Sequence, residues 1–358
     1  MIGLALLAPL SSFAEENGAN KKKPNIIYIL ADDLGISELG CYGQQLIETP
    51  NIDRLSQEGM TFSNHYSGTA VSAPSRCVLF TGLHTGHAYI RGNDEMASRG
   101  DVWNHKAVLA DSTLEGQRPV PAETVMIPAV MKQAGYTTAC IGKWGLGYPG
   151  SASTPNKMGF DFFYGYNCQR EAHTYYPPFL YRNEHREYLN NPLVVPHTKL
   201  DKGADPYEEK SYAKYTLNEY APDLMYKEIL NFIDLTKDNP FVLFWTTPLP
   251  HVPLQAPEKW VKHYVNKFGD EKPYTGNKDY FPCRYPRATY AAMIRSGDLL
   301  INLKNWESMT IPSSFLPVTT GRLSMAEAIL SFSIVLNHSK VNGAGAKHRS
   351  AKEAFVFR

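Results

Sequence analysis

The sequence is poor in the features that mark several common classes of protein. Its five cysteines are an odd number without paired spacing, so they indicate neither a disulfide framework nor a zinc site. Its 36 Lys and Arg residues nearly balance 35 Asp and Glu residues, so charge gives no basis for binding nucleic acid or an anionic membrane surface. No apolar run is long enough to span a bilayer, and no internal repeat or low-complexity tract is present.

One apolar run, at residues 2–14, has the length and the small residues at its end that are typical of a secretory signal peptide. It lacks a basic start, and the alternative is a hydrophobic N-terminus without that role. We expect a signal peptide over residues 1–14 and a flexible polar lead over residues 15–23, in a periplasmic or secreted protein.

The 358 residues, 43% of them hydrophobic, are enough for one large α/β domain. Continuous apolar runs at 24–31, 136–141 and 241–247 are typical of buried parallel strands. Helical patterns at 123–135 and 221–235 separate them. The alternation predicts a doubly wound α/β sheet whose ligands gather at the carboxyl ends of its strands.

Polar candidates follow each of these strands. Asp32 and Asp33 are adjacent after the first strand, and their carboxylates repel each other unless a cation lies between them. The alternative is an Asx turn with a helix cap. Lys143 follows the second strand and lies near glycines on both sides. It is either an anion ligand or a solvated charge, and we favour the ligand. His251, between prolines after the third, is interpreted as a working histidine.

A further candidate is Ser72, which opens a small-residue turn leading into a short apolar helix. Proline at position 74 is favoured in the first helical turn, so Ser72 lies at a helix N-terminus, where free N–H groups favour an anion. Arg76, one turn further on, falls on the same face. The alternative is an N-cap serine followed by an exposed arginine.

Two loops carry residues expected to contact a polar ligand. Arg91 and Asn93 lie in a polar loop after the Ser72 helix, and an aromatic loop carries Arg170, His173 and Tyr175. We expect them to form the wall of a polar pocket and to set the substrate.

Four segments together resemble the arylsulfatase-like branch of the sulfatase family: Asp32-Asp33, Ser-x-Pro-Ser-Arg-x-x-Leu-x-Thr-Gly from Ser72, Gly142-Lys143-Trp144 and Pro250-His251-x-Pro253. The resemblance covers about residues 24–293. It implies an alkaline-phosphatase-like mixed sheet with helices on both faces. It also implies hydrolysis of sulfate esters, of a carbohydrate above all, with a formylglycine made from the motif serine and one bound calcium.

The same resemblance implies roles for the site residues. Calcium ligands are Asp32, Asp33 and Ser72; Arg76 holds the formylglycine diol; Lys143 and His251 bind sulfate and help to protonate the leaving alcohol; Arg91, Asn93 and His173 contact the substrate. The implied partners are a sulfated small molecule or glycan and, because the motif begins with serine, a radical-dependent maturing enzyme. The alternatives are a phosphodiesterase or phosphonate hydrolase of the same superfamily and a non-catalytic protein that binds sulfated glycans.

The chain departs from the family pattern in two places. Gly145 stands where many members carry a histidine that reaches the diol. Residues 294–358 lack the Asp-Asn-Gly segment that completes the calcium site. A shifted reading frame permits Ser-Asp-Asn-Gly near residues 318–321, so we hypothesise that 294–358 is an out-of-frame or non-native tail. The domain at 24–293 would then be incomplete, with weak metal binding.

Overall fold

The computed structural model describes residues 23–62, 65–276 and 280–301, and the backbone of a strand at Ser331–Leu336. The predicted signal peptide and residues 15–22 of the predicted lead lie outside these ranges, so both stay predictions. Within the described ranges, no helix combines the length and the apolar character needed to cross a membrane.

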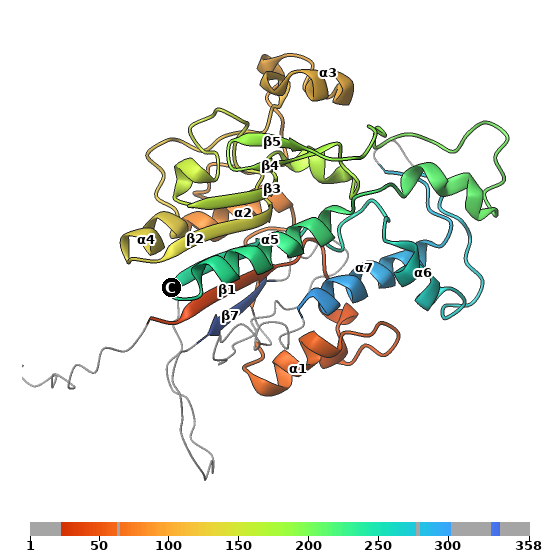
Figure 1. The fold of residues 1–358 in the computed structure, drawn as a ribbon, viewed down its shortest axis with the longest axis horizontal. Coiled ribbons are helices and arrows are strands. Elements are labelled where there is room, and N and C mark those ends of the chain that lie inside the picture. The colour runs from red at the N-terminus through yellow and green to blue at the C-terminus, as the bar shows by residue number, and fades with distance from the viewer. Residues whose placement is uncertain (1–22, 63–64, 277–279, 302–330, 337–358) are drawn as a thin grey trace, which may run out of the picture.

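In the described part of the chain, seven strands form one mixed sheet in the order β5-β4-β3-β2-β6-β1-β7 (Figure 1). The neighbours β3, β2, β6 and β1 are parallel, whereas β4, β5 and β7 join antiparallel. The strands are β1 Asn25–Leu30, β2 Thr137–Lys143, β3 Phe162–Tyr166, β4 Phe179–Arg182, β5 His185–Tyr188, β6 Phe241–Thr246 and β7 Ser331–Leu336. The three strands expected from apolar runs are β1, β2 and β6, which lie side by side.

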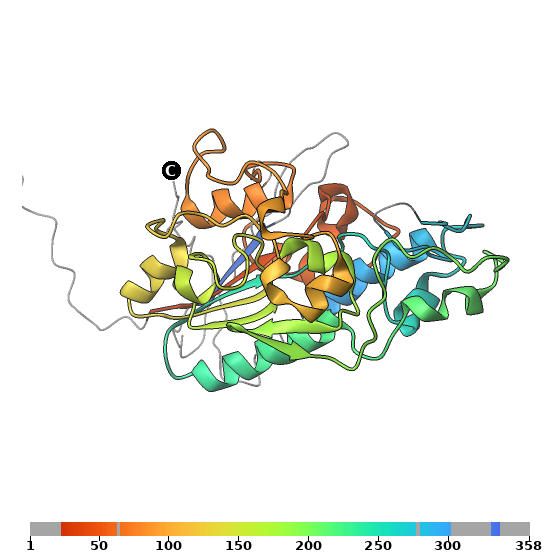
Figure 2. The ribbon, with the colours of Figure 1, turned by 90° about the horizontal axis from the view of Figure 1, so that it is seen from above.

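Helices cover both faces of this sheet, as Figure 2 shows for α5 below it and α2 above it. The helices are α1 Pro50–Glu58, α2 Ser72–Thr81, α3 His105–Ala110, α4 Ile127–Gln133, α5 Ala221–Thr236, α6 Glu258–Tyr264 and α7 Pro286–Leu300. The predicted doubly wound mixed α/β fold is therefore confirmed.

Alternate residues of one strand serve the two faces. Trp245 of β6 lies 6.3 Å, centroid to centroid, from Tyr226 of α5, while the preceding Phe244 lies 5.1 Å from Phe80 of α2. Because side chains alternate along a strand, a strand with helices on both sides must be apolar at every position. This is why β1, β2 and β6 are continuous apolar runs in the sequence.

The boundary predicted at residue 293 falls inside α7, which continues to Leu300. Asp298 in its last turn is buried, and its carboxylate accepts hydrogen bonds from the amides of Asn51 (3.0 Å) and Ile52 (2.8 Å) in α1. Residues up to 301 therefore pack within the domain. Beyond them, only the backbone of β7, paired antiparallel with β1, is described. The frameshift stays a prediction, which the coding DNA across codons 293–358 tests.

Candidate active site

The sequence-predicted site residues meet where neighbouring parallel strands end. Asp32 follows β1, Lys143 is the last residue of β2, and His251 lies in the loop after β6. The Asp32 amide donates to the carbonyl oxygen of Leu249 at 3.1 Å, which ties the first loop to the third. Ser72 enters the same edge as the first residue of α2. Strand order thus brings together side chains that are up to 219 positions apart.

Four side chains, Asp32, Ser72, Arg76 and Lys143, form what we call the charged cluster. Ser72 Oγ donates to Asp32 Oδ1 at 2.5 Å, and Lys143 Nζ donates to Asp32 Oδ2 at 2.6 Å. Arg76 Nη2 lies 3.6 Å from the same Oδ2, and Arg76 Nη1 donates to the Lys143 carbonyl at 2.7 Å. All four residues are buried, with exposed fractions from 0% to 3%.

The charged cluster carries more positive than negative charge. Burial alone would raise the pKa of Asp32, but attraction to Lys143 and Arg76 outweighs it and holds that pKa well below its usual range. Two buried cations then face one carboxylate, and the Nε and Nη2 of Arg76 have no hydrogen-bond partner among the described residues. Such a surplus favours an anionic ligand beside Ser72.

The alternative interpretation of Ser72 and Arg76 is wrong in both parts. The N-cap of α2 is the extended Val71, so Ser72 is the first helical residue and its hydroxyl bonds to Asp32 instead of capping. Arg76 is fully buried. The helix ends at Gly82, the last residue of the motif, which adopts the left-handed conformation (φ 67°) that favours glycine.

His251 and His173 lie beside the charged cluster. His251 Nε2 is 3.4 Å from Asp33 Oδ2, and the two imidazoles stack with centroids 5.7 Å apart. Burial, with Lys143 nearby, lowers the pKa of His251 to about 4, and burial, with His251 nearby, lowers the pKa of His173 to about 3. Both rings are therefore neutral at pH 7. Because His251 Nδ1 lies 2.5 Å from the Val252 carbonyl, this nitrogen carries the proton and Nε2 is the acceptor.

The predicted substrate contacts fall into different surroundings. Asn93 accepts a hydrogen bond from the Ala73 amide at 2.9 Å, so it holds the start of α2 next to Ser72. Arg91 is exposed and donates to carbonyls of its own loop, at Gly86 (2.8 Å) and Ala88 (3.2 Å). Contact of these side chains with a substrate stays a prediction.

The aromatic loop splits into two kinds of residue. The Tyr175 hydroxyl is buried 2.7 Å from the carbonyl oxygens of Pro248 and His251, so it positions the His251 loop and does not line a pocket. Arg170 is 5% exposed and pairs with Glu171 at 3.2 Å, while its Nε and Nη1 have no hydrogen-bond partner among the described residues. Sequence reasoning missed Tyr280, whose ring lies 5.7 Å from His173; no motif surrounds it.

The oxygen donors at this edge match a hard cation. Asp32, Asp33 and Ser72 supply carboxylate and hydroxyl oxygens of the kind that calcium prefers, but calcium takes six to eight of them. Among the described residues, no group of three or more His, Cys, Asp or Glu side chains is placed to hold a metal ion. Calcium binding by Asp32, Asp33 and Ser72 therefore stays a prediction.

The departure at Gly145 has a structural reason. This residue is left-handed (φ 79°), and a Cβ there would lie 3.0 Å from Gln169 Oε1. A histidine here would be strained by the left-handed backbone, and the end of the Gln169 side chain would have to shift to admit it.

The family model described as Sulfatase matches residues 24–303. The chain belongs to the sulfatase family. It is similar to the N-acetylgalactosamine-6-O-sulfatase of Bacteroides thetaiotaomicron (38% identity, 45% of this chain and 30% of the relative). It is also similar to the N-acetylgalactosamine-6-sulfatase of Rattus norvegicus, with 29% identity over 74% of this chain and 47% of the relative. The arylsulfatase of Klebsiella aerogenes matches with 27% identity over 82% of this chain and 57% of the relative. The chain thus spans between 30% and 57% of the length of these three relatives.

Solved structures support the sulfatase fold. The structure of Ps i-CgsB matches with a TM-score of 0.61 and 23% identity, covering 88% of this chain and 66% of that one. The PsFucS1 sulfatase of Pseudoalteromonas sp. matches with a TM-score of 0.55 and 18% identity, covering 88% of this chain and 62% of that one. The resemblance to the sulfatase family and the expected fold are both confirmed.

Proposed function

We propose that this sulfatase-family protein hydrolyses sulfate esters of a carbohydrate, using a formylglycine made from Ser72. One observation carries the proposal: Ser72 Oγ is buried between Asp32 (2.5 Å) and the ammonium of Lys143 (3.5 Å), in a cluster with surplus positive charge. A carbohydrate is favoured because two of the similar proteins are named as N-acetylgalactosamine sulfatases.

In this proposal, a hydrated formylglycine at position 72 supplies an oxygen nucleophile, and a calcium ion held by Asp32, Asp33 and residue 72 supplies positive charge beside it. The chain's own cations do the rest of the binding. Lys143 lies within reach of residue 72 and offers N–H donors to a sulfate oxygen, while the buried guanidinium of Arg76 holds the diol in place.

His251 must gain a proton before it can donate one. Its Nε2 is an acceptor in the neutral ring, so the ring must take up a proton from solvent, and the negative charge of an arriving sulfate ester favours the resulting imidazolium. Nε2–H can then donate to the leaving alcohol oxygen. His173 stacks on the His251 imidazole and so helps to hold that ring in its orientation.

The test is to express the protein together with a serine-type radical-dependent maturing enzyme and to measure the intact mass of the Ser72 peptide. We expect a loss of two hydrogens, as the hydroxymethyl group becomes an aldehyde, and release of sulfate from N-acetylgalactosamine 6-sulfate. Ser72→Ala should abolish both, and Ser98→Ala, at an exposed serine outside the motif, should keep both.

Other outcomes would point to other functions. Unmodified Ser72 with retained binding of a sulfated glycan would favour a non-catalytic binding protein. Faster cleavage of an aryl phosphate diester than of an aryl sulfate would favour a phosphodiesterase or phosphonate hydrolase.

We also infer a periplasmic or secreted location from the signal-peptide pattern at residues 1–14. N-terminal sequencing of the protein recovered after export tests this, and recovery with residues 1–14 intact in the cytoplasm would contradict it.

A further inference from the structure

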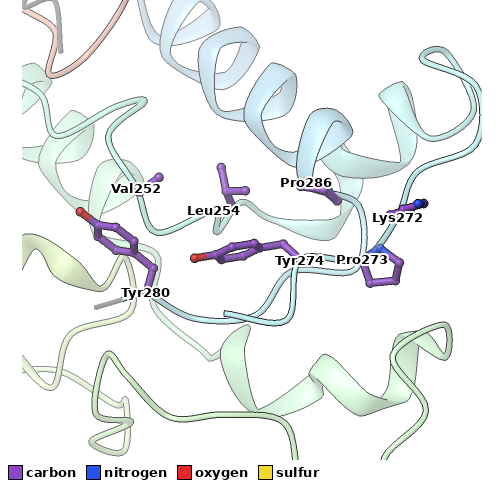
Figure 3. Close-up of a pocket in the computed structure, with 7 residues that line it drawn as sticks. All are labelled: Val252, Leu254, Lys272, Pro273, Tyr274, Tyr280 and Pro286. Atoms are coloured by element: carbon purple, nitrogen blue, oxygen red, sulfur yellow. The ribbon is translucent and has the colours of Figure 1, made fainter. Parts of the chain in front are cut away.

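A pocket of about 490 Å³ is lined in part by two tyrosines, and we call it the tyrosine pocket (Figure 3). Its walls are mainly apolar and aromatic: Val252, Leu254, Tyr274, Tyr280 and Pro286, with Lys272 at the end away from Tyr280. This volume and lining are typical of a small-molecule site.

The tyrosine pocket neighbours the candidate active site through one ring contact and one chain neighbour. The Tyr280 ring lies 5.7 Å from that of His173, which stacks on His251. On the opposite wall, Val252 directly follows His251 in the chain. A group placed beside His251 therefore has the tyrosine pocket as its next neighbour on this side.

The part of the wall that carries Tyr274 is tied down by backbone hydrogen bonds. Tyr274 and Cys283 exchange two backbone hydrogen bonds, of 2.9 and 2.8 Å. At the base of this hairpin, the Glu271 carboxylate accepts a hydrogen bond from the Arg287 amide at 2.6 Å, in the first turn of α7. The backbone of Tyr274 is thus held in place before any ligand arrives, which lowers the entropy cost of binding to its ring.

The shape and the chemistry of the pocket fit a saccharide with an acidic group. Tyr274 and Tyr280 are partly exposed, so a sugar ring can lay an apolar face on them while its hydroxyl edge stays hydrated. Lys272 is exposed at the end of this pocket, where an ammonium can pair with a carboxylate or sulfate. A wholly apolar leaving group would contact the tyrosines but would leave Lys272 without a partner in the ligand.

We infer that the tyrosine pocket binds the sugar unit adjacent to the sulfated one, with Lys272 pairing to an acidic substituent on it. This rests on the proposed function and deepens it: an acidic oligosaccharide is preferred as substrate over an isolated monosaccharide or an aryl sulfate.

The experiment measures binding without chemistry. The probe is an unsulfated tetrasaccharide of alternating N-acetylgalactosamine and uronic acid, titrated calorimetrically against the full chain. We expect Tyr274→Leu and Tyr280→Leu each to weaken binding roughly tenfold. Lys272→Gln should weaken it about threefold and remove most of its salt dependence.

Matched controls lie far from the pocket along the chain. Tyr188→Leu, at a tyrosine that is 66% exposed on β5, and Lys202→Gln, at an exposed lysine, should bind the probe as the unchanged protein does. Thermal unfolding of each variant shows whether it is folded, and the surface variant Lys272→Gln keeps the test decisive if a tyrosine variant does not fold.

The inference and the proposed function fail separately. Absent probe binding, or equal binding by the Tyr280→Leu, Lys272→Gln and unchanged proteins, overturns the inference even if an aryl sulfate is hydrolysed. Equal binding of a probe whose uronic carboxyls have been reduced to alcohols also overturns it. Conversely, pocket-dependent binding by a protein whose Ser72 is never modified supports the inference and sinks the proposed function.

Discussion

The charged cluster and the tyrosine pocket lie on either side of the His251–His173 pair, yet they are built in opposite ways. The charged cluster is fully enclosed, with Lys143 and Arg76 around one carboxylate at the ends of central strands. The tyrosine pocket is open and apolar, and it is carried by loops and the start of α7. Charge buried on a rigid sheet suits an invariant reacting group, whereas an aromatic wall on loops suits a part that differs between substrates.

This contrast predicts that the charged cluster, unlike the pocket, carries both stability and function. Asp32→Ala should lower the free energy of unfolding by about 3–5 kcal/mol, because it leaves two buried cations without their counter-charge. Denaturant unfolding measures this. Asp94→Ala, which breaks an exposed pair with Arg118, is the control and should cost under about 1 kcal/mol. Equal losses in the two variants would contradict the role given to burial.

The histidine pair, between the two regions, should affect chemistry more than stability. With a sugar sulfate as substrate, His251→Asn should reduce kcat about 100-fold, because a poor leaving alcohol needs its proton. The same substitution should reduce kcat much less for an aryl sulfate whose leaving phenol is acidic. His263→Asn, at a surface histidine 42% exposed, serves as control. A uniform loss with both substrates would show that His251 does not protonate the leaving group.

The pair should also make the domain sensitive to acid. The folded-state pKa of His173 is about 3, below its ordinary value of 6.5, so between pH 6 and pH 4 the unfolded chain binds the proton and the folded one does not. Stability therefore falls as pH falls, by about 1.4 kcal/mol per pH unit from this residue. His173→Gln should reduce the measured slope by that amount. An unchanged slope would mean that His173 is protonated in the folded state.

The smallest effect expected is that of calcium. With only part of an oxygen shell among the described residues, about 1 mM calcium should stabilise the protein by less than about 1.5 kcal/mol. Calorimetric titration and melting with a chelator measure this, with Asp33→Asn as the variant that removes one ligand. Tight binding would show that the remaining ligands are supplied elsewhere in the chain.

Much of the architecture could be predicted from local patterns. The runs at 24–31, 136–141 and 241–247 are apolar at every position because both sheet faces are covered, and they became adjacent strands. The antiparallel strands β4 and β5 were not foreseen. They are only four residues long and lie at an edge, and the exposed and half-buried residues of β5 carry no strong apolar signal.

The site was predictable to the extent that its residues sit in motifs at strand ends. Ser72, Lys143 and His251 were identified in this way. Asn93 and Tyr175 were predicted as residues of the pocket wall, but their contacts with the Ala73 amide and the His251 loop were not predicted, because such contacts have no signature in the sequence. Tyr280 lies 107 positions from His173, so only the folded chain shows that they touch.

The sequence by itself determined the layered sheet and the set of reactive side chains, because apolar periodicity and motif spacing are local properties of the chain. Tertiary structure alone decided how those side chains are charged and what they face. The low pKa of Asp32, the neutral state of His251 and the aromatic wall beside it all depend on burial and on distances between distant segments. These are properties of the packed molecule, and no local pattern carries them.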